Sequence, residues 1–342
     1  MDFGYTDEQE LLVDSIKEFC ERYTSEEQIK EMYKDHKMSE ELTSAWMENG
    51  FGLMGIPEQY EGIDTDLVTL GILTEEFAHY SGCMLPTLNN TLAMRDFIDF
   101  GASPEQIEEA MGSYLETGQP IFSLGFSEPG AGSDNQAMTC VTKKQEDGTY
   151  LLNGQKTWVT LGGLSIYTMV VAKDEDPSYE NDKYSLWLVP NDTPGFTIGA
   201  HEKKMGIRGS ATSELVFEDV KLPKENLLGE LGKGFKVAMT TLDGGRIGIA
   251  AQALGIGEAA IAATVKYTQE RVQFGKRISQ FQNTQFQLAD MQAKCDAAKL
   301  LIYRAAQAKQ DHEPFSHLAA EAKLFASEMA SDVTRRCLQL IG

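Results

Sequence analysis

The sequence is poor in the residues that build disulfide scaffolds and metal sites. Its 342 residues include five cysteines, widely spread and without CxxC spacing, and five histidines that form no HExxH pair. An odd number of scattered cysteines argues against a disulfide framework and favours a reducing, cytoplasmic location. The same spacing predicts neither a zinc site nor a catalytic metal.

Long apolar runs and an excess of positive charge are also missing. No stretch approaches twenty apolar residues, and the N-terminal MDFGYTDEQE lacks the basic and apolar regions of a secretory signal. We therefore expect no membrane span. Acidic residues outnumber basic ones by 52 to 30, for a net charge of −22. Such a surface repels nucleic acid and anionic membranes; it serves solubility, or a partner with a basic patch.

What the sequence does contain falls into three segments. In residues 1–120, Thr6–Gln9 has the form of a capping box, and Ser103–Gln106 repeats it with proline at the first helical position. Apolar residues then recur every three or four positions, which predicts helices. The segment is expected to be a helical domain.

Residues 121–230 change to short β-rich runs. Asp147-Gly148 and Asn153-Gly154 both have the form of tight hairpin turns. In the last run, Leu215 and Phe217 alternate with polar neighbours, as in a half-buried strand. No βαβ unit is visible, so this segment predicts an antiparallel β domain in the form of a meander.

From residue 231 to 342 helical periodicity returns. Two apolar stripes at three- and four-residue spacing are expected to pack on neighbouring helices; they consist of Leu288, Met291, Cys295, Ala298 and Ile302, and of Leu318, Ala322, Phe325, Met329 and Val333. Helices, then strands, then helices predict an α+β multidomain protein with segregated layers. The first and last segments are expected to share one core.

The stretch SEPGAGSD, Ser127 to Asp134, has the composition of a phosphate-binding loop or of a plain turn. A dinucleotide-binding fold would require GxGxxG followed by a helix. Here Gly130 and Gly132 lack a third glycine, and the residues that follow have strand character. The Rossmann interpretation therefore fails. A turn, or a loop that offers amides and hydroxyls to a ligand on a sheet, both remain open.

Five motifs, in their order and spacing, resemble the acyl-CoA dehydrogenase family of flavoproteins. They are SEPGAGSD, NGQKTWVT, KKMGIRGSATSELVFEDVKLP, LDGGRIGIAAQALGIGEAA and QERVQFGKRISQFQNTQFQLADM. The second half is most similar to the short-chain, butyryl-CoA type. The resemblance covers the whole chain and implies an N-terminal helical domain, a middle β domain and a C-terminal four-helix bundle, incomplete at residue 342. It also implies FAD between the β domain and the bundle.

The resemblance assigns cofactor contacts to the middle segment. It implies that the backbones of Leu124 and Phe126 contact the flavin ring and that the Ser127 hydroxyl bonds the ring. Ser133 would touch the FAD pyrophosphate or the CoA part of the substrate. In TWVT, Trp158 would cover one face of the flavin, while Thr160, two residues on and on the same face of a strand, would reach the ring edge.

Two further groups follow from the C-terminal motifs. Asp243 and Arg246 lie one helical turn apart and would form a simple ion pair, or line the CoA side of the substrate tunnel as the resemblance implies. Residues matching Arg271, Phe274, Gln282 and Gln339 hold the FAD of a neighbouring subunit in the family, which implies a homotetramer or at least a dimer. Without the resemblance, Gly275 would simply end one helix before the next. Arg208 stays unassigned.

The implied reaction removes two hydrogens from the Cα–Cβ bond of an acyl-CoA, with electrons passing to an electron-transferring flavoprotein. A glutamate takes the α-proton, but neither position at which the family carries it supplies one within residues 1–342, so we expect the base to lie beyond residue 342. The alternatives are an enoyl-CoA reductase running in reverse, a non-catalytic acyl-CoA or flavin-binding protein, and a flavin-dependent monooxygenase of the same fold. Four candidates would set acyl-pocket depth: Thr87, Leu88, Thr91 and Met94.

Overall fold

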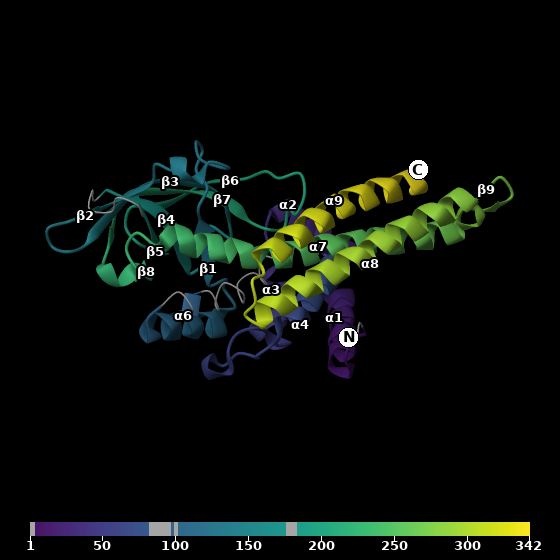
Figure 1. Ribbon diagram of the computed structural model, residues 1–342, viewed down its shortest axis with the longest axis horizontal. Coiled ribbons are helices and arrows are strands. Elements are labelled where there is room, and N and C mark those ends of the chain that lie inside the picture. Colours follow the sequence, from purple (N-terminus) through teal and green to yellow (C-terminus); the bar gives the residue numbers. More distant parts are fainter. Residues whose placement is uncertain (1–3, 82–96, 99–101, 176–182) are drawn as a thin grey trace. The chain divides into compact units, whose positions relative to one another are not determined.

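The computed structural model describes residues 4–81, 97–98, 102–175 and 183–342 (Figure 1). The chain forms two compact units. The helical unit comprises Met1–Glu31, Thr65–Leu85 and Asp243–Gly342; the sheet unit comprises Met32–Asp64 and Pro86–Leu242. The order of helices, strands and helices along the sequence confirms the predicted fold class. The four candidates for acyl-pocket depth and Cys83 lie outside the described residues.

Eight α-helices are described. They are α1 (Asp7–Tyr23), α2 (Glu26–Asp35), α3 (Glu40–Glu48), α4 (Leu67–Tyr80), α6 (Pro104–Thr117), α7 (Gly234–Glu270), α8 (Gln282–Gln310) and α9 (Ser316–Ile341). The predicted capping boxes are confirmed at two of them. On α1, Thr6 Oγ1 accepts from the Gln9 amide at 3.2 Å while Gln9 Oε1 accepts from the Thr6 amide at 3.1 Å. Ser103 and Gln106 make the same reciprocal pair on α6.

The core of the helical unit follows the predicted stripes except at Leu288, which is only half-buried, and at one position of α9. Met291, Cys295 and Ile302 of α8 are fully buried. On α9, Phe325 is 37% exposed, and the adjacent Ala326 is buried instead. The predicted stripe is wrong by one residue at this point: Ala326 faces the core in place of Phe325, because the small alanine side chain allows α9 to approach its neighbours closely.

By length and composition alone, an 18-residue window of helix α7 is long and apolar enough to cross a membrane. Half of that window is buried inside the protein. A core helix of a water-soluble protein meets the same criterion, so this composition does not establish a membrane span.

The sheet unit contains one eight-stranded sheet, with the path β6-β7-β3-β2-β4-β5-β8 and β1 paired to β4. Its strands are β1 (Phe122–Gly125), β2 (Val141–Lys144), β3 (Tyr150–Thr160), β4 (Tyr167–Asp174), β5 (Tyr184–Pro190), β6 (Phe196–His201), β7 (Thr212–Leu222) and β8 (Leu227–Leu228). The predicted antiparallel meander is wrong in two respects: β4 pairs in parallel with β1 and with β2, and β3 pairs with β7, which is distant in sequence. Short strands with crossovers carry the same periodicity as a meander, so the pattern did not distinguish them.

The two predicted hairpin turns have different outcomes. Gly148, with φ of 86°, lies in the turn between the antiparallel strands β2 and β3, as expected. Asn153-Gly154 does not form a turn, because β3 continues through it with a shift in register between Leu152 and Gly154. A Cβ at Gly154 would lie 2.6 Å from Cys140 Cα. The glycine thus permits a close backbone approach at a bulge, which is the other use of glycine in a strand.

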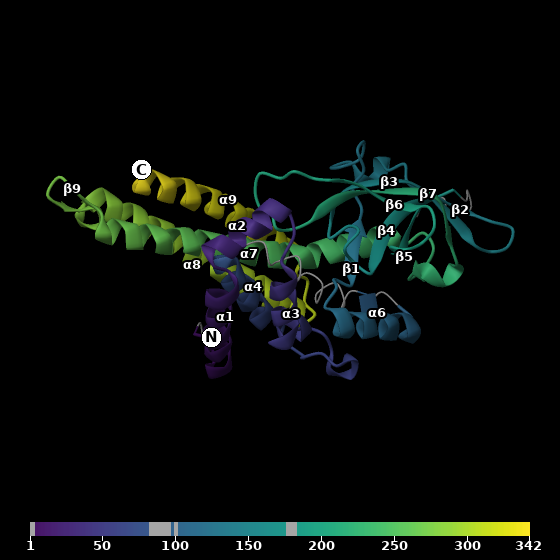
Figure 2. The same ribbon diagram turned by 180° about the vertical axis from the view of Figure 1, so that it is seen from behind.

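Alternate residues of the sheet face two clusters of apolar side chains. On β4, Met169 and Val171 belong to the cluster that includes α6, whereas Val170 and Ala172 belong to the cluster that includes β7. Figure 2 shows α6 beside β1, β4 and β5. The predicted alternation on β7 is confirmed, because Leu215 and Phe217 are buried and Glu218 is exposed.

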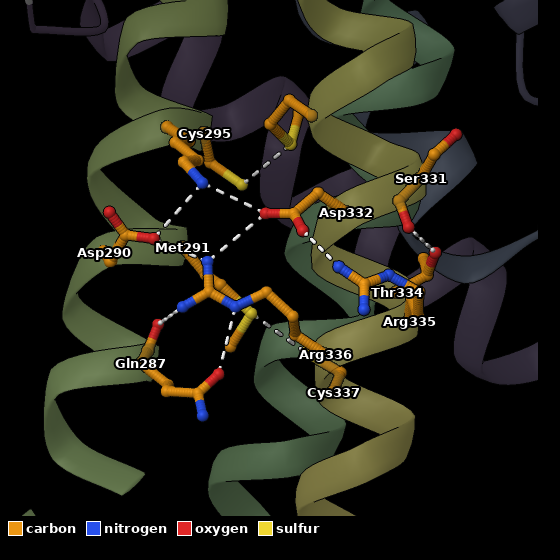
Figure 3. A network of polar contacts seen from close by, with 12 residues as sticks. Gln287, Asp290, Met291, Cys295, Ser331, Asp332, Thr334, Arg335, Arg336 and Cys337 are labelled. Atoms are coloured by element: carbon orange, nitrogen blue, oxygen red, sulfur yellow. Dashed lines mark hydrogen bonds and ion pairs between the residues drawn. The ribbon is translucent and has the colours of Figure 1, made fainter. Parts of the chain in front are cut away.

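A polar network joins α8 to α9 in the helical unit (Figure 3). Arg336 donates to Gln287 Oε1 at 3.0 Å and to Asp290 Oδ2 at 2.5 Å, and it lies 3.2 Å from Asp332. Lys294 bridges Asp290 and Asp332 at 3.2 and 3.0 Å. Because Arg336 is only 17% exposed, its donors are largely withdrawn from water.

Replacing Arg336 with leucine is expected to lower the free energy of unfolding by about 1–2 kcal/mol, since several charge-assisted hydrogen bonds are lost. Urea denaturation followed by circular dichroism measures this. The control is Lys30→Ala, which breaks a 2.6 Å ion pair whose partners are 69% and 83% exposed. We expect no measurable change there, because water and salt screen the pair. Equal effects from both variants would contradict the prediction.

Candidate functional site

The sheet unit presents the loop Ser127–Asp134 directly after β1. The loop closes on itself: the Glu128 and Ala131 amides each bond the other residue's carbonyl, at 3.0 and 3.1 Å. Ser127 is half-buried and Ser133 exposed, and within the described part of the chain neither hydroxyl makes a hydrogen bond. These hydroxyls are not used to cap the turn. Both are available to a ligand, with Leu124 and the buried Phe126 immediately before them.

Beside this loop, β3 exposes a large aromatic side chain. Trp158 is 60% exposed and has φ of 58°, a conformation that costs free energy for a residue with a Cβ. The register of β3 against β7 shifts between Lys156 and Val159, so Trp158 lies on a bulge. Trp158 and Thr160 are exposed and Val159 between them is buried. The two predicted residues therefore share the solvent-facing side of β3.

A backbone hydrogen bond joins the loop to the bulge. The Thr157 amide donates to the Ser127 carbonyl at 2.9 Å. The hydroxyl-bearing loop and the exposed indole are therefore fixed relative to each other. An exposed apolar ring beside unpaired hydroxyls and free amides is a surface suited to a planar ligand with polar edges.

A buried ion pair lies beneath the loop, and sequence analysis missed it. Lys156 Nζ is 2.9 Å from Glu128 Oε1, with side chains 0% and 3% exposed. Glu128 also accepts from the Thr139 amide at 2.6 Å and from the Cys140 amide at 2.9 Å. Burial alone would raise the pKa of Glu128, but these hydrogen bonds and Lys156 outweigh it and hold the pKa below its usual range.

Two of the three residues predicted to contact the substrate, Asp243 and Arg246, lie in the helical unit, whereas Ser133 lies in the sheet unit. Asp243 and Arg246 form an ion pair on α7, and Ser316 donates to Asp243 Oδ2 at 2.5 Å. The Arg246 side chain remains 38% exposed. The simple ion-pair interpretation and a ligand role are both compatible with this geometry, because a paired arginine keeps further donors for a phosphate.

The residues predicted to serve a neighbouring subunit gather at one end of the helical unit. Arg271 follows α7, Phe274 lies in the hairpin of β9 (Val272–Gln273) and β10 (Lys276–Arg277), and Gln282 begins α8. This corrects the simple helix end expected at Gly275, whose φ of 77° serves the hairpin instead. Figures 1 and 2 show that the C-terminal end of α9, which carries Gln339, lies at the same end of the bundle.

All four of these side chains are exposed, and Phe274 is 92% exposed. The Phe274 ring makes an edge-on contact with Phe281 at 6.3 Å between centroids, yet it remains largely in water on a backbone with φ of 54°. The four side chains therefore form an exposed group at this end of the bundle.

A separate cavity of about 780 Å³ opens in the helical unit. Tyr5, Lys299 and Tyr303 line it with apolar residues of α4 and α8. None of the predicted site residues does so. This cavity and the predicted ligand contacts therefore lie in different places.

Comparison with known proteins gives matches to three family models along the chain. The N-terminal domain of acyl-CoA dehydrogenase matches residues 6–116, the middle domain matches 123–220, and the C-terminal domain matches 232–342. A short-chain specific acyl-CoA dehydrogenase of Megasphaera elsdenii is 40% identical over all of this chain and 90% of its own length. The chain belongs to the acyl-CoA dehydrogenase family.

Solved structures of the family agree with this membership. Butyryl-CoA dehydrogenase from M. elsdenii has a TM-score of 0.93 at 40% identity, covering 100% of this chain and 90% of that one. A structure described as the electron transferring flavoprotein of Acidaminococcus fermentans has a TM-score of 0.91 at 39% identity, covering 100% and 89%. A glutaryl-CoA dehydrogenase from Mycobacterium smegmatis in complex with FADH2 has a TM-score of 0.87 at 26% identity, covering 99% and 85%.

Proposed function

We propose that this family member is an FAD-dependent oxidoreductase that acts on the Cα–Cβ bond of a short-chain acyl-CoA and passes electrons to an electron-transferring flavoprotein. One observation carries the proposal: Trp158 is held exposed on a bulge beside Thr160 and the hydroxyl-bearing loop. Short-chain and butyryl-CoA specificity among the similar proteins supports the substrate class, and the description of one neighbour supports the electron partner.

The residues present fit a flavin. A flavin is planar and apolar on its faces, and the indole of Trp158 offers a ring of matching shape. Its edge carries carbonyl oxygens and nitrogens, for which Ser127, Thr160 and the loop amides offer hydrogen-bond partners. A Cβ added at Gly130 or Gly132 would meet nothing within 4 Å, so the loop also leaves room for phosphate groups.

When bound, FAD supplies the acceptor for the hydride that leaves Cβ. The chain's residues would hold and orient it: Trp158 would cover one face of the ring, and Thr160 and Ser127 would bond its edge. Asp243 and Arg246 would hold the CoA side of the substrate. The family resemblance assigns the α-proton to a glutamate that residues 1–342 do not supply at either family position.

The test of this function uses the full-length protein expressed from its gene. Purified protein should be yellow, and anaerobic addition of butyryl-CoA should bleach the flavin band. A yellow protein that no acyl-CoA bleaches would be a non-catalytic acyl-CoA or flavin-binding protein. A protein that bleaches with reductant and is reoxidised by crotonyl-CoA, but is not bleached by butyryl-CoA, would be the enoyl-CoA reductase. A protein that binds no FAD would refute all three.

Replacing Trp158 with alanine is expected to weaken FAD binding about tenfold, because an aromatic stacking contact is lost. Stability should change by less than about 0.5 kcal/mol, since the side chain is largely exposed. Titration of apo-protein with FAD, followed by flavin fluorescence, measures the dissociation constant. Trp158→Phe is the control and should lose at most a few-fold. Unchanged affinity in the alanine variant would place the flavin elsewhere.

The same proposal includes a homotetramer and a cytoplasmic location. Exposed Arg271, Phe274, Gln282 and Gln339 at one end of the bundle support a site shared between copies. The four described cysteines, all buried and free, support a reducing compartment. Sedimentation velocity measures the oligomeric state, and a monomer that binds FAD with full affinity would contradict a shared site.

A further inference from the structure

We propose that Lys156 is a positioning residue of the flavin-binding surface, an inference that rests on the proposed function. Its ammonium group fixes the Phe126 carbonyl and the Glu128 carboxylate, and so sets where the Ser127 hydroxyl and the Trp158 ring are presented. Lys156 lies on the buried side of β3 and would touch neither cofactor nor substrate.

The contacts of Lys156 run along the underside of the loop. Its Cγ lies 3.2 Å from where a Cβ of Gly125 would be, so this glycine leaves room for the lysine stem. Its Nζ donates to the Phe126 carbonyl at 3.1 Å and to Glu128 Oε1 at 2.9 Å. One ammonium group thus bonds a residue on either side of Ser127.

Lys156 also sets the position of Trp158. It is the last residue of β3 before the shift in register against β7, and two residues later the backbone of Trp158 adopts its positive φ. The intervening Thr157 amide bonds the Ser127 carbonyl at 2.9 Å. The ion pair and this backbone bond therefore hold the bulge and the loop together from two sides.

A purely stabilising role does not account for this arrangement. A buried ion pair is seldom more stable than apolar residues of the same volume, because two charges lose their hydration. Such pairs can instead fix one arrangement among several, because every donor and acceptor must be satisfied. Here the arrangement fixed is that of the Ser127 hydroxyl and the Trp158 ring, the two groups that the proposed function assigns to the cofactor.

The test compares three variants with the wild-type protein, in FAD titration of the apo-protein and in the visible circular dichroism of bound flavin. Lys156→Met should raise the FAD dissociation constant by about tenfold to a hundredfold, the range for losing hydrogen bonds to a charged group that orients a ligand site. The visible dichroism, which reports the surroundings of the ring, should change in shape as well.

Lys156→Met with Glu128→Gln is the second variant, which keeps the proposal testable if the single variant unfolds. It restores charge balance. Thr139 and Cys140 donate to different oxygens of Glu128, and glutamine keeps an acceptor for only one of them, so the melting temperature of the double variant should recover part of the loss. The Phe126 carbonyl still lacks the lysine donor, so the dissociation constant should stay at least about fivefold raised.

Lys299→Met is the matched control, because it breaks the buried lysine–glutamate pair of the helical unit, where Lys299 Nζ lies 2.6 Å from Glu75 Oε1. It should lower the melting temperature without altering the flavin dichroism. If the Lys156 double variant binds FAD with wild-type affinity and dichroism, Lys156 has a structural role only and the inference is overturned. If wild-type protein binds no FAD, the proposed function itself fails.

Discussion

Replacing Lys299 with methionine is expected to lower the free energy of unfolding by about 3–5 kcal/mol at pH 8.5, because it leaves buried carboxylates without a cation. Lys299 Nζ lies 2.6 Å from Glu75 and 3.3 Å from Glu258, and the Glu75 side chain is fully buried. Tyr303 also donates to Glu75 Oε2 at 2.9 Å. Guanidinium denaturation of the full-length protein, followed by far-ultraviolet circular dichroism, measures the loss.

The effect should depend on pH, since two carboxylates share one ammonium. Burial, and then the charge of Glu258, raise the pKa of Glu75 to about 8 from its ordinary 4.5, against the opposing effect of Lys299. The pKa is higher in the folded than in the unfolded state, so the folded state binds the extra proton. Glu75 therefore costs stability progressively as pH rises from about 4.5 to about 8, and the cost is constant above that range.

Glu75→Gln is the matched control for the number of carboxylates around Lys299. It leaves one carboxylate, Glu258, with one ammonium, and glutamine can still accept from Tyr303. We expect this variant to be at least as stable as the wild type at pH 8.5 and to gain less, or nothing, at pH 5. His79, whose pKa burial lowers, titrates in both proteins and cancels in the comparison. At each pH, the measured quantity is the free energy of unfolding of the variant minus that of the wild type. A lower difference at pH 8.5 than at pH 5 would refute the proposed cost of ionising Glu75.

Much of the fold could be predicted because local chemistry determines it. The capping boxes at Thr6 and Ser103, the alternation on β7 and most of the stripe on α8 each depend on residues within one element. Pairing between strands that are distant in the sequence leaves no such local pattern. The parallel pairing of β4 with β1 and β2 depends on residues far apart in the sequence. The continuation of β3 through Gly154 depends on what this glycine faces across the sheet.

The candidate site was predictable to the same degree. The exposure of Trp158 and Thr160 on one side of β3 follows from alternation, which sequence analysis used. The same alternation would place Lys156 on that exposed side as well. The bulge between Lys156 and Val159 puts the residues before it on the opposite face of the strand, so the lysine is buried against Glu128. One extra residue in a strand thus hid the ion pair from any periodic pattern.

Replacing Gly255 with alanine is expected to destabilise the helical unit by about 2–3 kcal/mol, although alanine is the better helix former by about 1 kcal/mol. A Cβ at Gly255 on α7 would lie 2.0 Å from the Glu75 carbonyl oxygen and 2.8 Å from Ala78 Cβ. Both neighbours belong to α4, and the carbonyl is backbone that no rotamer change can move. The two helices must therefore separate, and their close packing is lost.

Gly112→Ala on α6 is the control, because a Cβ there would meet nothing within 4 Å. It should stabilise the protein by about 0.5–1 kcal/mol, which shows the helix preference without the clash. Gly255 faces the backbone of the same Glu75 whose side chain binds Lys299, so Gly255→Ala and Lys299→Met should not be additive. A double variant that loses less than the sum of the singles would show that separating α4 from α7 had already weakened the ion pair. Strict additivity, or a stabilised Gly255→Ala protein, would contradict the close approach of α4 and α7.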